Sequence, residues 1–181
     1  IMSETIVKVL ITEEQIQQRA KEIAAQIDKD FKGQEILLVG TLKGAVMWMS
    51  EVMKHITVDC KIDFVIASSY GSATTSSGII KIKKDVDTNI AGKNISIVED
   101  IVDTGNTLIK LKEHFLNMQP KSVKICSMLD KPSRREADLT IDYIGFEVEN
   151  LFIVGYGLDF DQKYRDLPYI SYLTNDEIEA E

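Results

Sequence analysis

Residues 95–108 read ISIVEDIVDTGNTL, and this stretch is the most informative part of the sequence. Residues 95–98 are apolar or small and β-branched at three of four positions, which predicts a short buried strand. Residues 104–107, Thr-Gly-Asn-Thr, have little bulk and favour a helix start, and the apolar spacing from Leu108 onward is helical. A helix N-terminus presents free backbone N–H groups and the positive end of the helix dipole. The turn between strand and helix therefore predicts a phosphate-binding site.

Three carboxylates stand in front of this predicted phosphate site. Glu99 and Asp100 are adjacent in an expected acidic loop, and Asp103 follows just before the turn. Carboxylates repel phosphate, so they need another partner near an anion site. We expect them to hold sugar hydroxyls, a divalent cation or a proton in transit.

Strands and helices alternate along the rest of the chain. A capping-box pattern, Thr12 with Gln15, begins a helix over 12–30, and further helices are expected up to about residue 55 and up to Pro120. Strands are expected over 36–39, 62–67, 122–129, 143–146, 151–155 and 169–172, with an exposed hairpin strand at 80–82. The last residues, 174–181, are acidic and expected to fray. This alternation predicts an α/β fold, a mostly parallel central sheet flanked by helices with a small C-terminal hood elaboration.

Four polar segments follow predicted strands, at 40–44, 99–107, 130–135 and 156–161. Ligands in parallel sheets bind beyond the carboxyl ends of the strands. We therefore expect one shared site in a single domain spanning residues 1–181.

Composition narrows the class of protein. The chain has 181 residues, 44% of them hydrophobic, and a formal charge of −8, which argues against nonspecific binding to nucleic acid. No apolar stretch approaches the ~20 residues that span a bilayer, and no export signal is recognisable. Cys60 and Cys126 fit no metal spacing and are expected to be reduced thiols. We therefore expect a cytoplasmic protein with no membrane partner.

The stretch 95–107 resembles the phosphoribosyl-diphosphate-binding motif of type I phosphoribosyltransferases: an apolar strand, two acids, two apolar residues, Asp-Thr/Ser-Gly, a variable residue and Thr. The resemblance implies that Glu99 and Asp100 address the ribose hydroxyls and Mg²⁺. It implies that Asp103 is the general base for N7 of a purine. The implied 5-phosphate ligands are Thr104, Gly105, Asn106 and Thr107.

The resemblance extends to two further loops. Lys43 and Gly44 match a loop that binds diphosphate, commonly with a non-proline cis peptide before the lysine; an ordinary surface lysine is the simpler alternative. Residues 68–78 have no bulky aliphatic side chain, and Ser69 and Tyr70 match a recurring Ser-Tyr pair. In the family this segment is a long flexible loop that closes over the site and excludes water.

The base side of the site is implied by residues far downstream. Lys131 matches a lysine that donates to the 6-oxo group of a purine, and Phe152 matches an aromatic residue that stacks on the base. Ile153 would meet the base edge through its backbone, Asp159 would help to hold a second Mg²⁺, and Arg165 would bind diphosphate. Phe152 could instead be a core aromatic residue, and Arg165 could form a surface ion pair with Asp161 or Asp166.

Together these matches imply an enzyme of purine salvage. It would transfer the 5-phosphoribosyl group from phosphoribosyl diphosphate to hypoxanthine or guanine, forming IMP or GMP and diphosphate, with Mg²⁺ as cofactor. Xanthine as the best base remains an alternative, as does a regulatory protein on the same fold that binds RNA or DNA; the −8 charge opposes the latter. Family members are homodimers or homotetramers, and Met47, Trp48 and Met49 could be interface or core. His55 and His114 have no metal-ligand spacing and are expected to be structural.

Overall fold

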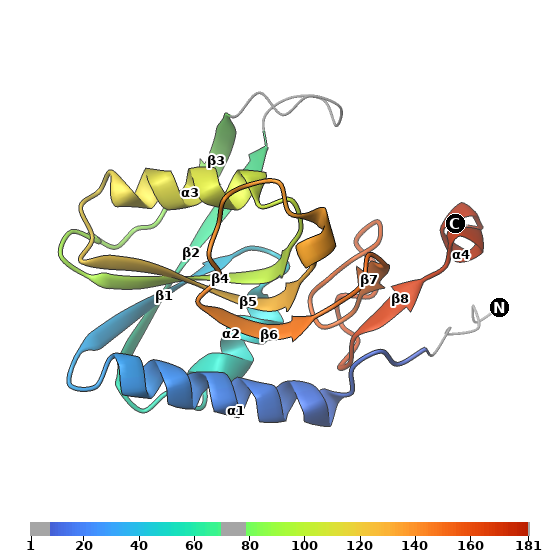
Figure 1. The fold of residues 1–181 in the computed structure, drawn as a ribbon, viewed down its shortest axis with the longest axis horizontal. Coiled ribbons are helices and arrows are strands. Elements are labelled where there is room, and N and C mark those ends of the chain that lie inside the picture. The colour runs from blue at the N-terminus through green and yellow to red at the C-terminus, as the bar shows by residue number, and fades with distance from the viewer. Residues whose placement is uncertain (1–7, 70–78, 181) are drawn as a thin grey trace.

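A six-stranded sheet forms the centre of the molecule (Figure 1). The computed structural model describes residues 8–69 and 79–180. The strand order is β3-β2-β1-β4-β5-β6, and every neighbouring pair is parallel except β2 with β3. This confirms the predicted mostly parallel α/β fold. The strands are β1 (Glu35–Thr41), β2 (Asp59–Ser69), β3 (Ile80–Lys84), β4 (Asn94–Val102), β5 (Ser122–Asp130) and β6 (Tyr143–Glu147).

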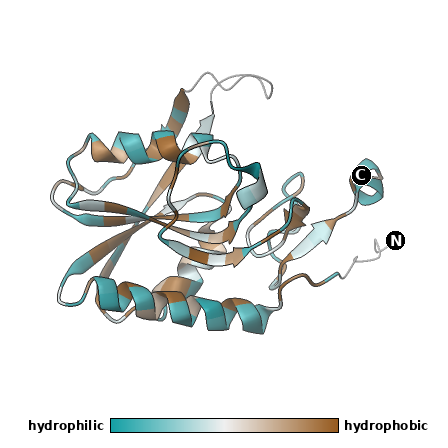
Figure 2. Cartoon of the chain, viewed as in Figure 1, coloured by the Kyte–Doolittle hydropathy of each residue, from teal (hydrophilic) through white to brown (hydrophobic). Residues whose placement is uncertain are grey.

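Helices cover both faces of this sheet. Helices α1 (Glu13–Asp30) and α2 (Val46–Met53) lie on one face and α3 (Asn106–Leu116) lies on the other (Figure 1). Thr12 and Gln15 form the predicted capping box at the start of α1. Figure 2 shows apolar and polar residues alternating around α1, and its apolar side packs into the core beneath the sheet. Burial on both faces explains why the central strands β1 and β4 contain continuous buried runs.

A second, two-stranded sheet lies beyond the carboxyl ends of the central strands. It pairs β7 (Phe152–Val154) with β8 (Ser171–Leu173) in antiparallel fashion. The backbone N–H groups of Leu10 and Ile11 donate to the Ile170 carbonyl. The N-terminal segment therefore packs against this small sheet, which we call the hood. A 3-10 turn, η1 (Pro132–Arg134), connects β5 to the segment before β6. The hood and η1 frame the edge of the sheet at which the predicted polar segments converge.

The structure corrects two local predictions. Strand β4 continues through Val102 in register with β5, so Glu99 and Asp100 lie within a strand and not in a loop. The C-terminal residues expected to fray form a short helix, α4 (Asn175–Glu179), because the Thr174 side chain accepts the Glu177 N–H at 3.3 Å.

Burial answers the interface-or-core alternative for Trp48 and Met49, whereas Met47 is partly buried against the same core. Trp48 and Met49 are fully or almost fully buried in the core, so neither is available to an interface. His114 pairs with Asp85 at 2.8 Å and His55 with Glu51 at 3.5 Å, as expected for structural histidines. Among the described residues, no helix combines the length and apolar character needed to cross a membrane.

Candidate active site

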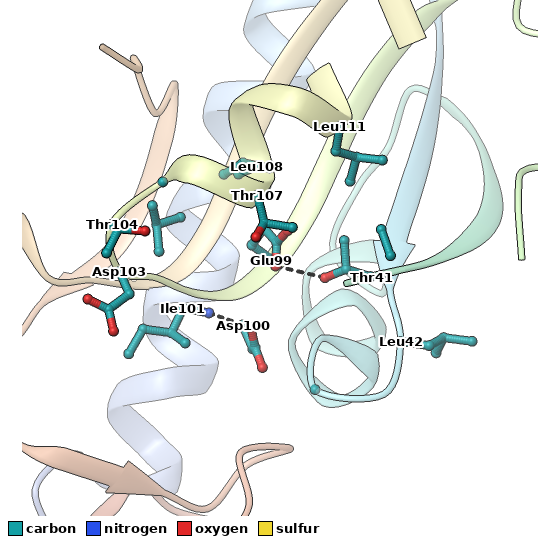
Figure 3. Close-up of a pocket in the computed structure, with 14 residues that line it drawn as sticks. Thr41, Leu42, Glu99, Asp100, Ile101, Asp103, Thr104, Thr107, Leu108 and Leu111 are labelled. Carbon is teal, nitrogen blue, oxygen red and sulfur yellow. Dashed lines mark hydrogen bonds between the residues drawn. The ribbon is translucent and has the colours of Figure 1, made fainter. Parts of the chain in front are cut away.

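Two cavities open at the carboxyl ends of β1, β4 and β5. The first, about 310 Å³, lies between the end of β1 and the turn that begins α3, and Figure 3 shows its lining residues. The second, about 400 Å³, lies between the end of β5 and the hood. Ile101 and Asp103 line both cavities. The two cavities therefore adjoin at Asp103 and form one composite site, as the convergence of the polar segments predicts.

The predicted phosphate turn lines the first cavity. Gly105 has a φ of 82°, a left-handed conformation that favours glycine. It is also the N-cap residue of α3, and it has no side chain to cap the helix. The first N–H groups of a helix have no intrahelical acceptor, so this end suits an anion. Thr104, Gly105 and Thr107 line the cavity. Asn106 lines neither cavity, because its side chain donates to Glu136 at 2.7 Å.

The acid pair is half-buried in the wall of the first cavity. Thr41 Oγ1 donates to the Glu99 carboxylate at 2.8 Å, shown as a dashed line in Figure 3. Burial, together with the neighbouring Asp100 charge, raises the pKa of Glu99 well above its ordinary value. Burial also raises the pKa of Asp100, although the Ile101 N–H bond opposes the rise. Two adjacent, partly desolvated carboxylates are costly unless a cation or hydrogen-bond donors join them.

The carboxylate donors fit a magnesium ion. Asp100 and Asp159 are close enough to affect each other electrostatically, and Mg²⁺ commonly binds through one or two carboxylates together with substrate phosphates. Within residues 8–69 and 79–180, no group of three His, Cys, Asp or Glu side chains forms a ready-made metal site. Asp100 and Asp159, with Glu99 behind them, would therefore hold Mg²⁺ jointly with a ligand.

The predicted diphosphate loop contacts this acidic wall. The Leu42–Lys43 peptide is cis, and Gly44 packs so closely on Asp100 that a Cβ at Gly44 would overlap the Asp100 carboxylate. Lys43 is exposed, and its Nζ donates to the Gln162 side chain at 3.2 Å.

Arg165 lies beside the same loop. Its guanidinium donates to the Gly157 carbonyl at 2.6 Å and to the Gln162 side chain at 3.3 Å. It forms an ion pair with Asp159 at 3.3 Å. Lys43 and Arg165, which are far apart in the sequence, therefore share one acceptor, the Oε1 atom of Gln162.

The base-side residues line the second cavity. Lys131 is buried, its Nζ donates to the Leu151 carbonyl at 2.6 Å, and burial lowers its pKa. Phe152 is 42% exposed and meets Phe160 edge to face at 5.3 Å, so it is not a core aromatic residue. Ile153 lines the cavity beside it. The cavity thus offers a buried cation at one side and an accessible aromatic ring at another.

Sequence reasoning gave no role to Arg134, although it is in a basic run that follows β5. Its Nε donates to the Asp103 carboxylate at 2.9 Å, at the junction of the two cavities. Arg134 was identifiable only as a charge near a turn, because its partner is 31 residues away in the sequence.

Ser69 is the last residue of β2 and lines neither cavity. Tyr70 and the rest of the predicted closing loop lie outside the described residues.

Comparison with known proteins identifies the class. The family model described as "Phosphoribosyl transferase domain" matches residues 10–161, and the chain belongs to this family. The resemblance inferred from residues 95–107 is therefore confirmed.

Relatives within the family are more specific. Hypoxanthine-guanine phosphoribosyltransferases from Bacillus subtilis and Streptococcus thermophilus are 48% and 47% identical to this chain over 173 residues. In each case the alignment covers 96% of this chain and 96% of the relative. A solved hypoxanthine-guanine phosphoribosyltransferase from Bacillus anthracis superposes with a TM-score of 0.90 at 49% identity, covering 93% of this chain and 99% of the other. The hypoxanthine phosphoribosyl transferase of Trypanosoma cruzi gives a TM-score of 0.92 at 36% identity, with both chains fully covered.

Proposed function

We propose that this chain transfers the 5-phosphoribosyl group from phosphoribosyl diphosphate to hypoxanthine or guanine, as a hypoxanthine-guanine phosphoribosyltransferase of purine salvage. The observation that supports this most strongly is the meeting of two chemically different cavities at Asp103. One has a helix N-terminus and an acid pair, and suits a sugar phosphate. The other has a buried lysine and an exposed aromatic ring, and suits a 6-oxopurine.

The reaction forms one bond and breaks another at C1 of the ribose. Purine N9 attacks C1, and the bond from C1 to the diphosphate oxygen breaks, with its electron pair leaving on diphosphate. Asp103 accepts the proton that leaves N7, which makes the purine a better nucleophile. Arg134 holds the Asp103 carboxylate at the junction of the cavities. Asp103 is the one carboxylate shared by both cavities, which supports its assignment as the base.

Lys131 is the proposed selector of the base. Its ammonium group is a donor with no acceptor capacity, so it favours a 6-oxo group and disfavours a 6-amino group. Phe152 stacks on the purine, and the backbone at Ile153 contacts its edge. Lys131 Nζ donates to the Leu151 carbonyl, which keeps the buried ammonium paired.

The remaining residues bind phosphoribosyl diphosphate. Thr104, Gly105 and Thr107 take the 5-phosphate, with the backbone of Asn106 beside them. Asp100 and Asp159, with Glu99 behind them, would hold Mg²⁺, which would neutralise charge on the diphosphate. Lys43, Gly44 and Arg165 bind the diphosphate itself. Ser69, the last residue of β2, leads into the segment that the sequence predicts to close over the site, and Tyr70 lies outside the described residues.

We also propose a single domain that assembles as a homodimer or homotetramer in the cytoplasm. The exposed apolar side chains Val46 and Met53 on α2, beside the diphosphate loop, support a contact between copies. Cys60 and Cys126 are both free, which fits a reducing compartment. Light scattering during size-exclusion chromatography measures the oligomeric state directly.

The decisive experiment is kcat/KM with hypoxanthine, guanine, xanthine and adenine under one set of conditions. We expect the two 6-oxopurines hypoxanthine and guanine to exceed adenine by at least about 10²-fold, because a buried donor facing an amino group is left unpaired. A preference for xanthine would change the assigned base and leave the reaction intact. Activity on adenine alone would refute the assignment of Lys131.

A further inference from the structure

A buried ion pair lies behind the phosphate turn, outside both cavities. Asp130, at the end of β5, is only 4% exposed, and its carboxylate accepts from the Arg135 guanidinium. The Nε of the same guanidinium donates to the backbone carbonyl of Asp103 at 3.2 Å. Neither Asp130 nor Arg135 lines a cavity, so the pair contacts the backbone of the turn and not the ligand space.

The residues after Arg135 hold the next carbonyl of the turn. The N–H groups of Glu136 and Ala137 both donate to the Thr104 carbonyl, at 2.9 and 3.1 Å. The turn also packs tightly on this segment, since a Cβ at Gly105 would lie 3.2 Å from Arg135 Cδ. The carbonyls of Asp103 and Thr104 thus both point toward the segment 135–137.

Because a peptide group is planar, these carbonyl contacts also fix the direction of two backbone N–H groups. In a trans peptide the C=O of one residue and the N–H of the next point in opposite directions. Among the described residues the one cis peptide is Leu42–Lys43, so the turn follows this rule. The N–H groups of Thr104 and Gly105 therefore point away from segment 135–137. Both residues line the first cavity, whereas Arg135 does not.

We propose that Arg135, held in place by Asp130, is a positioning residue that keeps the Thr104 and Gly105 N–H groups aimed at the 5-phosphate. The inference rests on the proposed function, which places that phosphate in the first cavity. Rotation of either peptide would turn a carbonyl oxygen toward the anion and replace attraction by repulsion. Glycine at position 105 makes such rotation easy, so the carbonyls need an external restraint.

The chemistry of the restraint requires arginine. One guanidinium reaches a backbone carbonyl through Nε and a carboxylate through Nη2, in a rigid planar fork. A lysine has one nitrogen on a flexible stem and cannot reproduce both contacts with fixed geometry. Arg135→Lys is therefore expected to keep the local charge and lose the restraint.

The test measures two ligands separately by isothermal titration calorimetry. Ribose 5-phosphate probes the turn, and inorganic diphosphate with Mg²⁺ probes the Lys43 side of the site. The variants are Arg135→Gln, Arg135→Lys and Asp130→Asn. Arg19→Gln is the matched control, because Arg19 also donates Nε to a carbonyl, Gly145 at 2.9 Å, and Nη1 to a carboxylate, Glu22 at 3.0 Å, but at the edge strand β6.

We expect Arg135→Gln and Arg135→Lys to raise the Kd of ribose 5-phosphate about 10-fold or more, as for loss of donors to a charged group. Diphosphate Kd should stay within about twofold, and Asp130→Asn should show a smaller loss in the same direction. Arg19→Gln should bind both ligands like the unaltered protein. This split between ligands is what a general loss of stability would not produce.

Two results would overturn the inference while the proposed function stands. One is unchanged ribose 5-phosphate affinity in a folded Arg135→Lys protein. The other is an equal loss of affinity for both ligands, which would make the pair a general structural support. If the unaltered protein itself fails to bind ribose 5-phosphate, the proposed phosphate site is wrong, and the role of Arg135 falls with it.

Discussion

The two halves of the site are built in different ways. The sugar-phosphate half comes mainly from one continuous stretch, β4, the turn and the start of α3, with the diphosphate loop beside it. The base half is assembled from the end of β5, η1 and the hood, which are joined only in space. The first presents backbone N–H groups at the phosphate turn, whereas the second presents the side chains of Lys131 and Phe152. Substitutions should therefore affect the two halves separately, except where they adjoin.

The largest effect is expected at that junction. Asp103→Asn keeps the shape of the side chain and removes the proton acceptor, so kcat/KM should fall about 10²–10⁴-fold with either base. Steady-state rates with hypoxanthine and guanine measure this. Asp138→Asn, an exposed carboxylate outside both cavities, is the control. Nearly intact turnover of Asp103→Asn would mean that another group takes the proton.

A smaller effect, confined to the base half, is expected for Lys131→Met. Loss of a charged donor to the 6-oxo group should lower kcat/KM for hypoxanthine about 10- to 150-fold. The KM for phosphoribosyl diphosphate should change little, because the substitution lies outside the first cavity. Discrimination against adenine should shrink by the same factor. An unchanged base preference would show that Lys131 does not select the base.

Phe152→Leu should have a still smaller effect on the same half. Aromatic contacts contribute about 0.5–1.5 kcal/mol beyond burial, so KM for the base should rise about 2- to 12-fold. Thermal stability should hold, because the ring is 42% exposed and not part of the core. Differential scanning fluorimetry beside the kinetics separates these effects. A large fall in Tm would show that Phe152 is part of the hydrophobic core.

The difference between the halves also explains what could be predicted from sequence. Strand, turn and helix signals lie within one short stretch, so the phosphate turn and the parallel sheet were predictable from local pattern. The extension of β4 through Glu99 and Asp100 was missed because charged residues are rare in buried strands, and pairing with β5 overrides local preference. Lys131 and Phe152 were found through resemblance alone.

Long-range partners were beyond local pattern altogether. The contact of Arg134 with Asp103 and that of Arg135 with Asp130 and the Asp103 carbonyl depend on how η1 folds back toward the turn. Sequence shows a basic run after a strand, and such a run is equally compatible with a solvated surface. Only the tertiary structure distinguishes a cation that restrains the motif from one that faces water.

The smallest predicted effect concerns stability in the sugar-phosphate half. Burial and the Asp100 charge raise the pKa of Glu99 from its ordinary 4.5, so the folded state disfavours the ionised form. The unfolded state loses this proton more readily, so the folding penalty is absent at low pH and grows as the pH rises above about 4.5. Glu99→Gln, which stays neutral and can still accept from Thr41, should therefore raise Tm near pH 8 by a few degrees, about 2–4 °C per kcal/mol, and hardly at all near pH 4.

Thr41→Val, which removes the 2.8 Å donor to Glu99, should lower Tm most near pH 8. Melting curves across this pH range check both, and a Tm gain for Glu99→Gln that is independent of pH would show that packing, not the buried charge, is responsible.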